Sequence, residues 1–334
     1  MSSNVSTHRL TRFVDLGQPR LGSRVVYATD EFFAEKIRLI SPAEPVWIPD
    51  KYDDNGKWMD GWESRRKRTP GHDYCIVRLG VPGLIHGFDI DTRHFTGNYP
   101  PAASIDACVY DDDIPPDDMT WTEIVPRTDL VGDSRHFVDA KPGREFSHVR
   151  LNIYPDGGVA RLRIYGSIRP DWHSMDLSQP VDLLAMKSGG RALACNDEHF
   201  GSMRNLNAPG RGINMGDGWE TARRRVPGND WVVMALGHPG HIEEIEIDTA
   251  HFKGNYPDRV MIRAGYMIEA TDEEAVAASQ QWPILLSEQK LKPDHQHIFK
   301  SLNGHDAVTH VLMNIYPDGG VSRLHIRGYP AGID

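Results

Sequence analysis

The chain repeats itself, because two long segments of its sequence each occur twice and in the same order. Residues 60–107 align without gaps on 217–264, with 25 identical residues in 48 positions. Residues 148–166 align on 310–328, with 14 identities in 19 positions. Similarity of this kind indicates a duplicated unit, so the two halves must share one fold. At 334 residues the chain has room for two domains, each able to bury its own core.

A third, shorter block indicates where each copy begins. The pattern RxxxxxDExF runs from Arg24 to Phe33 and recurs from Arg191 to Phe200. We therefore divide the chain into an N-terminal tail (1–20), a first repeat (21–169), a linker (170–180) and a second repeat (181–334). The offset between the copies is 167 residues at this block, 157 at the second and 162 at the third, so the lengths change between the blocks. Insertions in surface loops produce such changes.

Inside each copy the local pattern is that of β-strands. Residues 244–248 alternate between acidic residues and isoleucine, and residues 148–153 alternate between polar and apolar residues. The sequence YPDGG at 154–158 predicts a turn, because proline presets φ and glycine accepts positive φ. Alternation resumes beyond it, which predicts a hairpin. We expect Arg161 and Arg323, which follow this turn in the two copies, to form ion pairs within the sheet.

Helical signal is scarce. The segment from Thr271 to Gln281 is the best candidate, because Thr271 and Glu274 form a capping-box pattern before an alanine-rich turn. The first copy has residues 111–121, rich in aspartate and proline, in that place. Many short strands without alternating helices favour an all-β fold of the sandwich type over a parallel α/β sheet. The pattern alone leaves the strand order open.

Charge and cysteine content narrow the class of protein. There are 37 Lys and Arg residues against 47 Asp and Glu, a net charge of -10, which argues against nucleic acid or an anionic membrane as partner. No apolar run approaches membrane-spanning length, and residues 1–11 lack the apolar core of a signal peptide. The cysteines, Cys75, Cys108 and Cys195, are odd in number and unshared between the copies. We expect reduced thiols acting as small buried hydrophobes in a cytoplasmic protein.

The repeated blocks also resemble a known family. DGWExxRxRxPGxD, IDTxHFxGNYP and NIYPDGGVxRLxIxG each occur twice, in order, between about residues 21 and 328. This set resembles the allantoicases of purine catabolism. The resemblance implies two tandem jelly-roll β-sandwiches similar to the galactose-binding-like fold. It further implies hydrolysis of allantoate to ureidoglycolate and urea in allantoin degradation, by a homo-oligomer.

The repeated polar residues suit such a substrate. Allantoate carries a carboxylate and two ureido groups on one carbon, so its site needs a guanidinium clamp, acceptors for ureido N–H groups and a group that moves a proton to departing urea. Arg66 and Arg68, matched by Arg223 and Arg225, are the candidate clamp. The alternative is that these basic clusters are solvated loop residues.

The block IDTxHFxGN supplies the candidate catalytic residues. His94 and His251 follow Asp91 and Asp248 by three residues, and Asn98 and Asn255 lie four residues further on. We predict that the histidine moves protons, that the aspartate orients it and that the asparagine binds a ureido group. The alternative is a hydrogen-bonded loop that the fold requires in both copies.

An acidic pair opens each copy. We assign Asp30 and Glu31 to substrate binding, and Asp197 and Glu198, which His199 accompanies, to catalysis as base or ureido acceptor. A turn or helix cap by the aspartate explains the same residues without any role in chemistry.

Two further alternatives concern metal and function. An Asp–His pair suits Mn²⁺ or Zn²⁺, but its spacing is common, so we predict no metal ligands and no cofactor, although dependence on a divalent metal stays possible. The rival function is a tandem module that binds a small, sugar-like ligand without catalysis. Exposed aromatic residues in the loops would favour that module, whereas repeated charged residues and histidines favour the enzyme.

Overall fold

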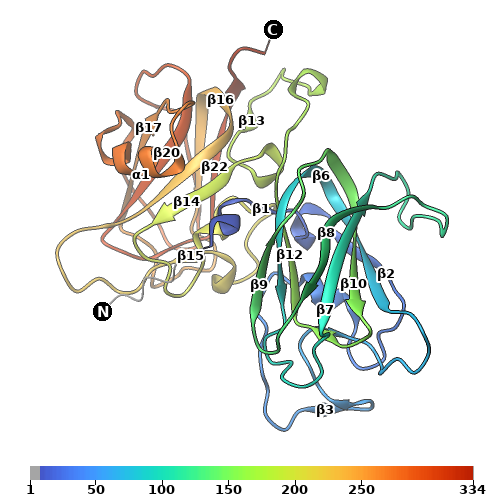
Figure 1. The fold of residues 1–334 in the computed structure, drawn as a ribbon. Coiled ribbons are helices and arrows are strands. Elements are labelled where there is room, and N and C mark those ends of the chain that lie inside the picture. The colour runs from blue at the N-terminus through green and yellow to red at the C-terminus, as the bar shows by residue number, and fades with distance from the viewer. Residues whose placement is uncertain (1–7, 334) are drawn as a thin grey trace. The chain divides into compact units, whose positions relative to one another are not determined.

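The computed structural model describes residues 8–333. Residues 1–7 of the N-terminal tail and Asp334 lie outside the described residues. The chain divides after Ile168 into two compact units, here called repeat 1 and repeat 2 (Figure 1). Both units are built almost entirely of strands, as the sequence predicts.

Repeat 1 contains twelve strands and three short 3₁₀ helices among its described residues. The strands are β1 (Val14–Asp15), β2 (Arg24–Ala28), β3 (Tyr52–Asp53), β4 (Gly56–Lys57), β5 (Trp62–Glu63), β6 (Asp73–Asp91), β7 (Ala102–Cys108), β8 (Thr122–Asp129), β9 (Arg135–Asp139), β10 (Glu145–Tyr154), β11 (Gly158–Val159) and β12 (Arg161–Ser167). The 3₁₀ helices are η1 (Arg9–Arg12), η2 (Pro19–Leu21) and η3 (Lys36–Ile40).

Repeat 2 follows the same plan and adds an α-helix. Its strands are β13 (Val181–Asp182), β14 (Arg191–Cys195), β15 (Trp219–Glu220), β16 (Asp230–Asp248), β17 (Arg259–Gly265), β18 (Ile284–Lys290), β19 (Gln296–Phe299), β20 (Val308–Tyr316), β21 (Gly320–Val321) and β22 (Arg323–Pro330). Its helices are α1 (Asp272–Ala278), η4 (Trp172–Ser174), η5 (Met186–Ser188), η6 (Met203–Asn205), η7 (Met215–Asp217) and η8 (Ser279–Gln281).

The long strand β6 belongs to both layers of its sandwich. Its first half pairs with β2 and β10, and its second half pairs with β9 and β12. β10 ends opposite Asp73 and β12 begins opposite Asp91, yet only residues 154–160 join these two strands. Seven residues reach about 25 Å, whereas a straight strand of this length would span about 60 Å. β6 therefore turns a corner near Gly80, and both of its ends lie at the same end of the sandwich.

This topology corrects one prediction. The hairpin predicted around residues 154–158 is wrong, because β10 and β12 do not pair with each other. The YPDGG turn instead carries the chain from the layer β8-β7-β10-β6-β2 to the layer β1-β12-β6-β9. Repeat 2 has the equivalent order β13-β22-β16-β20-β17-β18, with β14 and β19 paired to β16. The prediction that both halves share one jelly-roll sandwich fold is confirmed.

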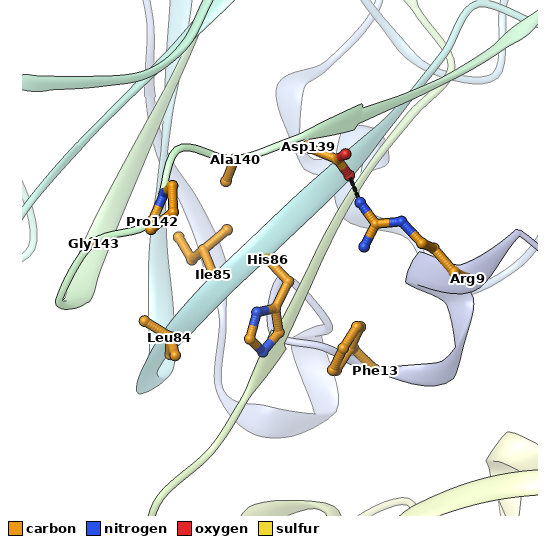
Figure 2. A pocket seen from close by; sticks show the side chains of 9 residues that line it. All are labelled: Arg9, Phe13, Leu84, Ile85, His86, Asp139, Ala140, Pro142 and Gly143. Carbon is orange, nitrogen blue, oxygen red and sulfur yellow. Dashed lines mark ion pairs between the residues drawn. The ribbon is translucent and has the colours of Figure 1, made fainter. Parts of the chain in front are cut away.

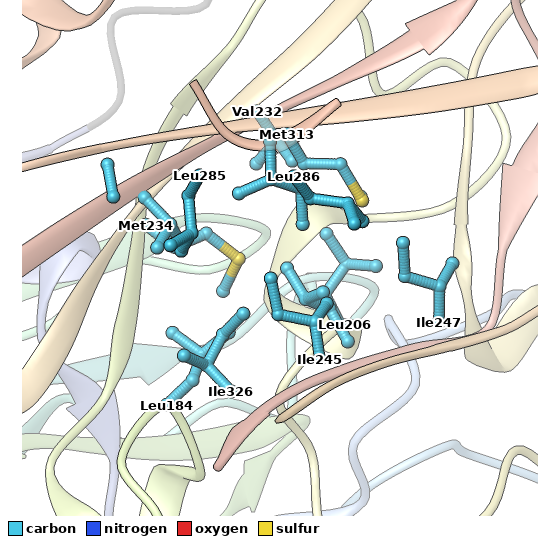
Figure 3. Close-up of a cluster of buried hydrophobic side chains, with 14 of the residues drawn as sticks. Leu184, Leu206, Val232, Met234, Ile245, Ile247, Leu285, Leu286, Met313 and Ile326 are labelled. Atoms are coloured by element: carbon cyan, nitrogen blue, oxygen red, sulfur yellow. The ribbon is translucent and has the colours of Figure 1, made fainter. Parts of the chain in front are cut away.

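The core of repeat 2 comes from the predicted alternation. Ile245 and Ile247 are fully buried in the apolar cluster shown in Figure 3. Glu246 and Asp248, on the opposite face, are buried as well, which the pattern did not indicate. Glu246 pairs with Arg327 at 2.7 Å, so the second face of this strand is polar but not solvated. A buried carboxylate needs such a partner.

Helix α1 confirms the helical prediction and marks a difference between the repeats. The capping box is present, since the Thr271 hydroxyl accepts from Glu274 N–H and the Glu274 carboxylate accepts from Thr271 N–H at 2.8 Å. The buried Ala275 of this helix belongs to an apolar cluster that contains Val233 and Leu312 on the outer face of the sheet. Residues 111–121 of repeat 1 contain no helix.

The three cysteines are free thiols. Cys75 and Cys108 are buried as predicted, whereas Cys195 is half-buried. Burial raises the pKa of Cys108 to about 11 and that of Cys195 to about 12. No helix in residues 8–333 is long and apolar enough to cross a membrane.

Candidate functional site

The repeated motifs meet at one end of each sandwich, where both ends of the long strand lie. In repeat 1 the Trp62 indole donates to the Asp30 carbonyl at 2.8 Å, and Gly158 N–H donates to the Asn98 carbonyl at 2.7 Å. The same two bonds join Trp219 to Asp197 and Gly320 to Asn255 in repeat 2. We call this region, made of residues 30–34, 60–68, 91–98 and 154–160 and their counterparts in repeat 2, the motif end.

Glycines allow the motifs to pack this closely. A Cβ atom on Gly158 would lie 2.0 Å from the ring of Phe95, and one on Gly320 would lie equally close to Phe252. Only a residue without a side chain fits there. The second glycine of DGG therefore holds the phenylalanine of HFxGN, and with it the loop that carries the candidate histidine and asparagine.

A glutamate and an asparagine form the most unusual contact of the motif end. The Asn98 amide donates to the Glu63 carboxyl group at 2.7 Å. Glu63 is buried and has no ion pair with any of residues 8–333. Burial raises the pKa of Glu63 to about 7, against the effect of the Asn98 hydrogen bond and with a contribution from Asp53. Desolvation without a cation favours the neutral acid.

Repeat 2 contains the same pair. The Asn255 amide donates to the Glu220 carboxyl group, and Glu220 is partly exposed. Both asparagines were predicted from the sequence as site residues, whereas both glutamates were not. The available signal was the last residue of DGWE, an acidic residue that follows a tryptophan at the same place in both copies.

The four candidate clamp arginines are free to bind an anion. Arg66, Arg68, Arg223 and Arg225 are exposed, and none has an ion pair or hydrogen bond from its side chain to the described part of the chain. The side chain between each pair of arginines is committed instead to a buried aspartate: Lys67 to Asp73 at 2.7 Å and Arg224 to Asp230.

The two candidate histidines have matching environments. Both adopt positive φ, 71° for His94 and 70° for His251. The ring Nε2 of His94 lies 3.2 Å from the Pro45 carbonyl, and that of His251 lies 2.8 Å from the Gly212 carbonyl. Because a carbonyl only accepts, Nε2 carries the proton in each ring and Nδ1 is the basic nitrogen of the neutral form.

The candidate aspartates do not contact these histidine rings. Asp91 accepts from Arg93 N–H at 2.8 Å and forms an ion pair with the Arg93 side chain at 2.6 Å. Asp248 accepts from Ala250 N–H at 2.8 Å and from Arg211 at 2.9 Å. Each aspartate thus closes a short turn and meets an arginine. No group of three or more His, Cys, Asp or Glu residues within 8–333 is arranged to hold a metal ion.

The acidic pairs lie at the motif end in both repeats, with different partners. In repeat 1 Asp30 forms an ion pair with Arg65 at 2.7 Å, and Glu31 forms one with Lys36 at 2.6 Å. Although burial acts in the other direction, the hydrogen bonds from Arg65 lower the pKa of Asp30.

In repeat 2 the acidic pair accepts hydrogen bonds from neutral groups. Asp197 accepts from the N–H groups of His199 at 3.1 Å and Ala222 at 2.8 Å. Glu198 accepts from the Ser202 hydroxyl at 3.1 Å and from Met203 N–H at 3.0 Å.

Arg161 and Arg323 form ion pairs as predicted, but their partners lie outside the strands and not within the sheet. Arg161 pairs with Asp60 at 2.8 Å, and Arg323 pairs with Asp217 at 3.0 Å. Both aspartates are the first residue of DGWE. These buried pairs connect the loop before the glutamate to the strand after YPDGG.

A cavity of about 370 Å³ lies at the other end of repeat 1, at the corner of β6 (Figure 2). The rings of His86 and Phe13 lie there with centroids 4.1 Å apart and planes tilted by 35°, and Arg9 forms an ion pair with Asp139. The cavity is built from residues outside the repeated motifs, and Glu243 replaces His86 in repeat 2. The motif end is therefore the candidate site.

Comparison with known proteins supports one family. The family model described as the allantoicase repeat matches residues 14–169 and again 181–331. Probable allantoicase 2 of Burkholderia pseudomallei is 54% identical over 318 residues, covering 95% of both chains. A probable allantoicase of Photobacterium profundum is 54% identical over 319 residues, covering 95% of this chain and 97% of the relative. The crystal structure of allantoicase from Saccharomyces cerevisiae superposes with a TM-score of 0.82 at 36% identity, covering 97% of this chain and 95% of that one.

Proposed function

The chain belongs to the allantoicase family, and from that premise we propose that allantoate is hydrolysed at the motif end. The protein is a hydrolase that converts allantoate and water to ureidoglycolate and urea in allantoin degradation. One observation carries the choice of site. In both repeats the same motifs pair a glutamate with an asparagine and supply two arginines that have no partner within residues 8–333.

The reaction defines what the site must do. The bond between the central carbon of allantoate and one ureido nitrogen breaks, and the hydroxyl group of water takes the place of that nitrogen. The departing nitrogen must gain a proton to leave as neutral urea. In repeat 1 the Glu63 carboxylic acid, whose pKa is raised to about 7, is suited to donate it, because half of such groups are protonated at neutral pH. Glu220 occupies the equivalent position in repeat 2, with the same asparagine contact.

The remaining residues fit the rest of the substrate. An exposed arginine without a partner binds a carboxylate in a bidentate way, and each motif end offers two: Arg66 and Arg68, or Arg223 and Arg225. The side-chain carbonyl of Asn98 or Asn255 is an acceptor for ureido N–H. The basic Nδ1 of His94 or His251 is suited to take a proton from water.

The rival reading, a binding module without catalysis, draws on one feature of repeat 1. Trp47 and Tyr52 are exposed in the loop before DGWE, and Phe32 is exposed beside it. The allantoicase relatives cover nearly the whole chain, which favours the enzyme over this module.

We also propose that the enzyme works in the cytoplasm as a homo-oligomer, without a cofactor and without nucleic acid or membrane as partner. Three unpaired thiols support a reducing compartment. The net charge of -10 opposes binding to polyanions. Exposed Trp47 and Tyr52 offer apolar surface for contact between copies.

The test removes the proposed proton donor from both repeats at once. Purified protein should release urea from allantoate, and the double variant E63Q/E220Q should lose about 100-fold or more in kcat with its circular dichroism unchanged. Removing all four clamp arginines should mainly raise KM. Assays with a chelator and with added Mn²⁺ serve as controls for metal. Wild-type kcat/KM in both variants would place the reaction elsewhere.

A further inference from the structure

The two motif ends differ in the partners of their acidic pairs and in the length of the loop beside those pairs. We propose that allantoate is turned over at the motif end of repeat 2, where Asp197 and Glu198 receive its ureido N–H groups, and that the motif end of repeat 1 is closed. This inference rests on the proposed function and assigns it to one of two related sites.

The acidic pairs of the two repeats accept equivalent hydrogen bonds from backbone N–H groups. Arg65 N–H donates to Asp30 at 2.9 Å, and Ala222 N–H donates to Asp197 at 2.8 Å. Lys36 N–H donates to Glu31 at 3.0 Å, and Met203 N–H donates to Glu198 at 3.0 Å. Residues 65 and 222 are thus equivalent in space as well as in sequence, and so are residues 36 and 203.

Two residue differences distinguish the acidic pairs: Arg65 of repeat 1 corresponds to Ala222, and Lys36 corresponds to Met203. The side chains of Arg65 and Lys36 turn back and form ion pairs with the carboxylates that their own backbones already contact. Ala222 and Met203 have no charge to offer. Within residues 8–333, Asp197 and Glu198 have no cation at ion-pair distance. Repeat 1 neutralises its acidic pair, whereas repeat 2 leaves both carboxylates available.

Availability matters because of what a ureido group presents. Each ureido group carries several N–H donors, and a carboxylate in water accepts from them readily only if a cation does not already occupy it. The substrate must displace Arg65 and Lys36 to reach Asp30 and Glu31. At Asp197 and Glu198 no cation within residues 8–333 has to be displaced.

The loop beside the acidic pair also makes the motif end of repeat 1 less accessible than that of repeat 2. Repeat 1 has ten more residues between the first two blocks, because the offset falls from 167 to 157. Its longer loop contains the hairpin β3–β4, whose Asn55 amide donates to the Phe32 carbonyl at 2.8 Å beside the acidic pair. The negative charge of Asp53, in this hairpin, contributes to the raised pKa of the Glu63 carboxyl group. Glu63 is buried, whereas Glu220 is partly exposed and lies where substrate can reach it.

The positive charge that binds the substrate carboxylate is present in repeat 2. Arg223 and Arg225 are exposed and have no partner in the described part of the chain, and exposed Lys253 stands where repeat 1 has Thr96. The site of repeat 2 therefore combines open acceptors, an accessible Glu220 and a local excess of cations.

The experiment gives the acidic pair of repeat 2 the two cations that Arg65 and Lys36 supply in repeat 1. The variant A222R/M203K should raise the KM for allantoate about ten-fold with a smaller change in kcat, because the new cations compete for Asp197 and Glu198. The uncharged variant A222L/M203L tests added apolar bulk without charge and should stay within about three-fold of wild type. The reciprocal variant R65A/K36M in repeat 1 should leave kcat/KM within about two-fold of wild type.

The outcomes separate this inference from the proposed function. A KM that A222R/M203K leaves unchanged, or that A222L/M203L raises equally, overturns the role of the two carboxylates. A loss of activity in R65A/K36M as large as in A222R/M203K overturns the assignment to repeat 2. If E63Q/E220Q abolishes urea release in the same preparation, the proposed function stands while the inference falls. A misfolded A222R/M203K is recognised by circular dichroism, and A222R alone then serves as the test.

Discussion

The two motif ends share their hydrogen bonds but differ in what surrounds them. In both repeats an asparagine of HFxGN contacts the glutamate of DGWE, and the tryptophan of DGWE contacts the acidic pair. Glu63 is nevertheless buried beneath a longer loop, and Glu220 is not. The motifs therefore specify local geometry, while loop length and two side chains that the copies do not share, at positions 65 and 36, distinguish the surroundings of the two motif ends.

The outer faces of the two sandwiches show the same division. In repeat 2 helix α1 and Trp282 cover an apolar face that includes Leu312. In repeat 1 Arg150 occupies the equivalent position, lies over the Trp121 ring at 4.6 Å and pairs with Asp106 at 2.7 Å. One fold thus accepts either an apolar face with a helix over it or a polar face without one, provided that each buried charge has a partner.

The largest expected effect comes from the buried arginines that anchor DGWE. We expect R323M to lower the free energy of unfolding by about 4 kcal/mol, because it leaves Asp217 buried without its cation. R161M should cost less, since the Asp60 side chain is 13% exposed and that of Asp217 is 4% exposed. Denaturant unfolding of the two variants measures the difference.

The control is the polar pair R323Q and R161Q, which tests whether a neutral polar side chain restores part of the loss. Equal losses for R323M and R161M, or a larger loss in repeat 1, would contradict the claim that the anchor of repeat 2 is the more deeply buried one.

A smaller effect is expected from the pH dependence of stability. Because the folded pKa of Glu63 is raised to about 7 from its ordinary value of 4.5, folding favours its neutral form. Its contribution is fully present below the unfolded pKa and is lost as the pH rises through about 7. This group should remove on the order of 3 kcal/mol of stability between about pH 4 and pH 8.

The variant E63Q isolates this contribution, because glutamine cannot ionise and should flatten the decline in stability from about pH 5 to pH 8. Urea unfolding across that range measures it, with E220Q as the matched variant at the accessible position. If wild type and E63Q have parallel pH profiles, Glu63 is not desolvated as described.

The fold followed from the sequence wherever local chemistry decides it. Alternation located the strands, and the pattern at Thr271 and Glu274 located the helix, because strand faces and capping boxes depend on residues close in sequence. The hairpin at 154–158 failed for a physical reason. A turn sequence fixes the bend of the chain but not the partner of the next strand, and β6, which separates β10 from β12, lies far earlier in the chain.

The candidate site was predictable in part. Duplication selected loops that do lie together, because the motifs that recur are those that meet at one end of each sandwich. It did not select Glu63, whose properties arise from a partner 35 residues away and from a loop that only repeat 1 has. Nor did duplication distinguish the environment of Asp30 from that of Asp197. The cation that distinguishes them, Arg65, stands at a position where the two copies differ.

The smallest expected effect concerns helix α1, the element that only repeat 2 has among the described residues. T271A removes the hydroxyl that caps the helix and should lower the free energy of unfolding by about 1 kcal/mol. T271S retains the hydroxyl and should stay within a few tenths of a kcal/mol of wild type. Because the helix packs on Val233 and Leu312, amide exchange should accelerate in residues 272–278 and in the strands beneath them, but not in repeat 1. Faster exchange in the sheet of repeat 1 would mean that the two sandwiches do not lose stability independently. Unchanged exchange in repeat 2 would mean that its outer face does not depend on the helix that covers it.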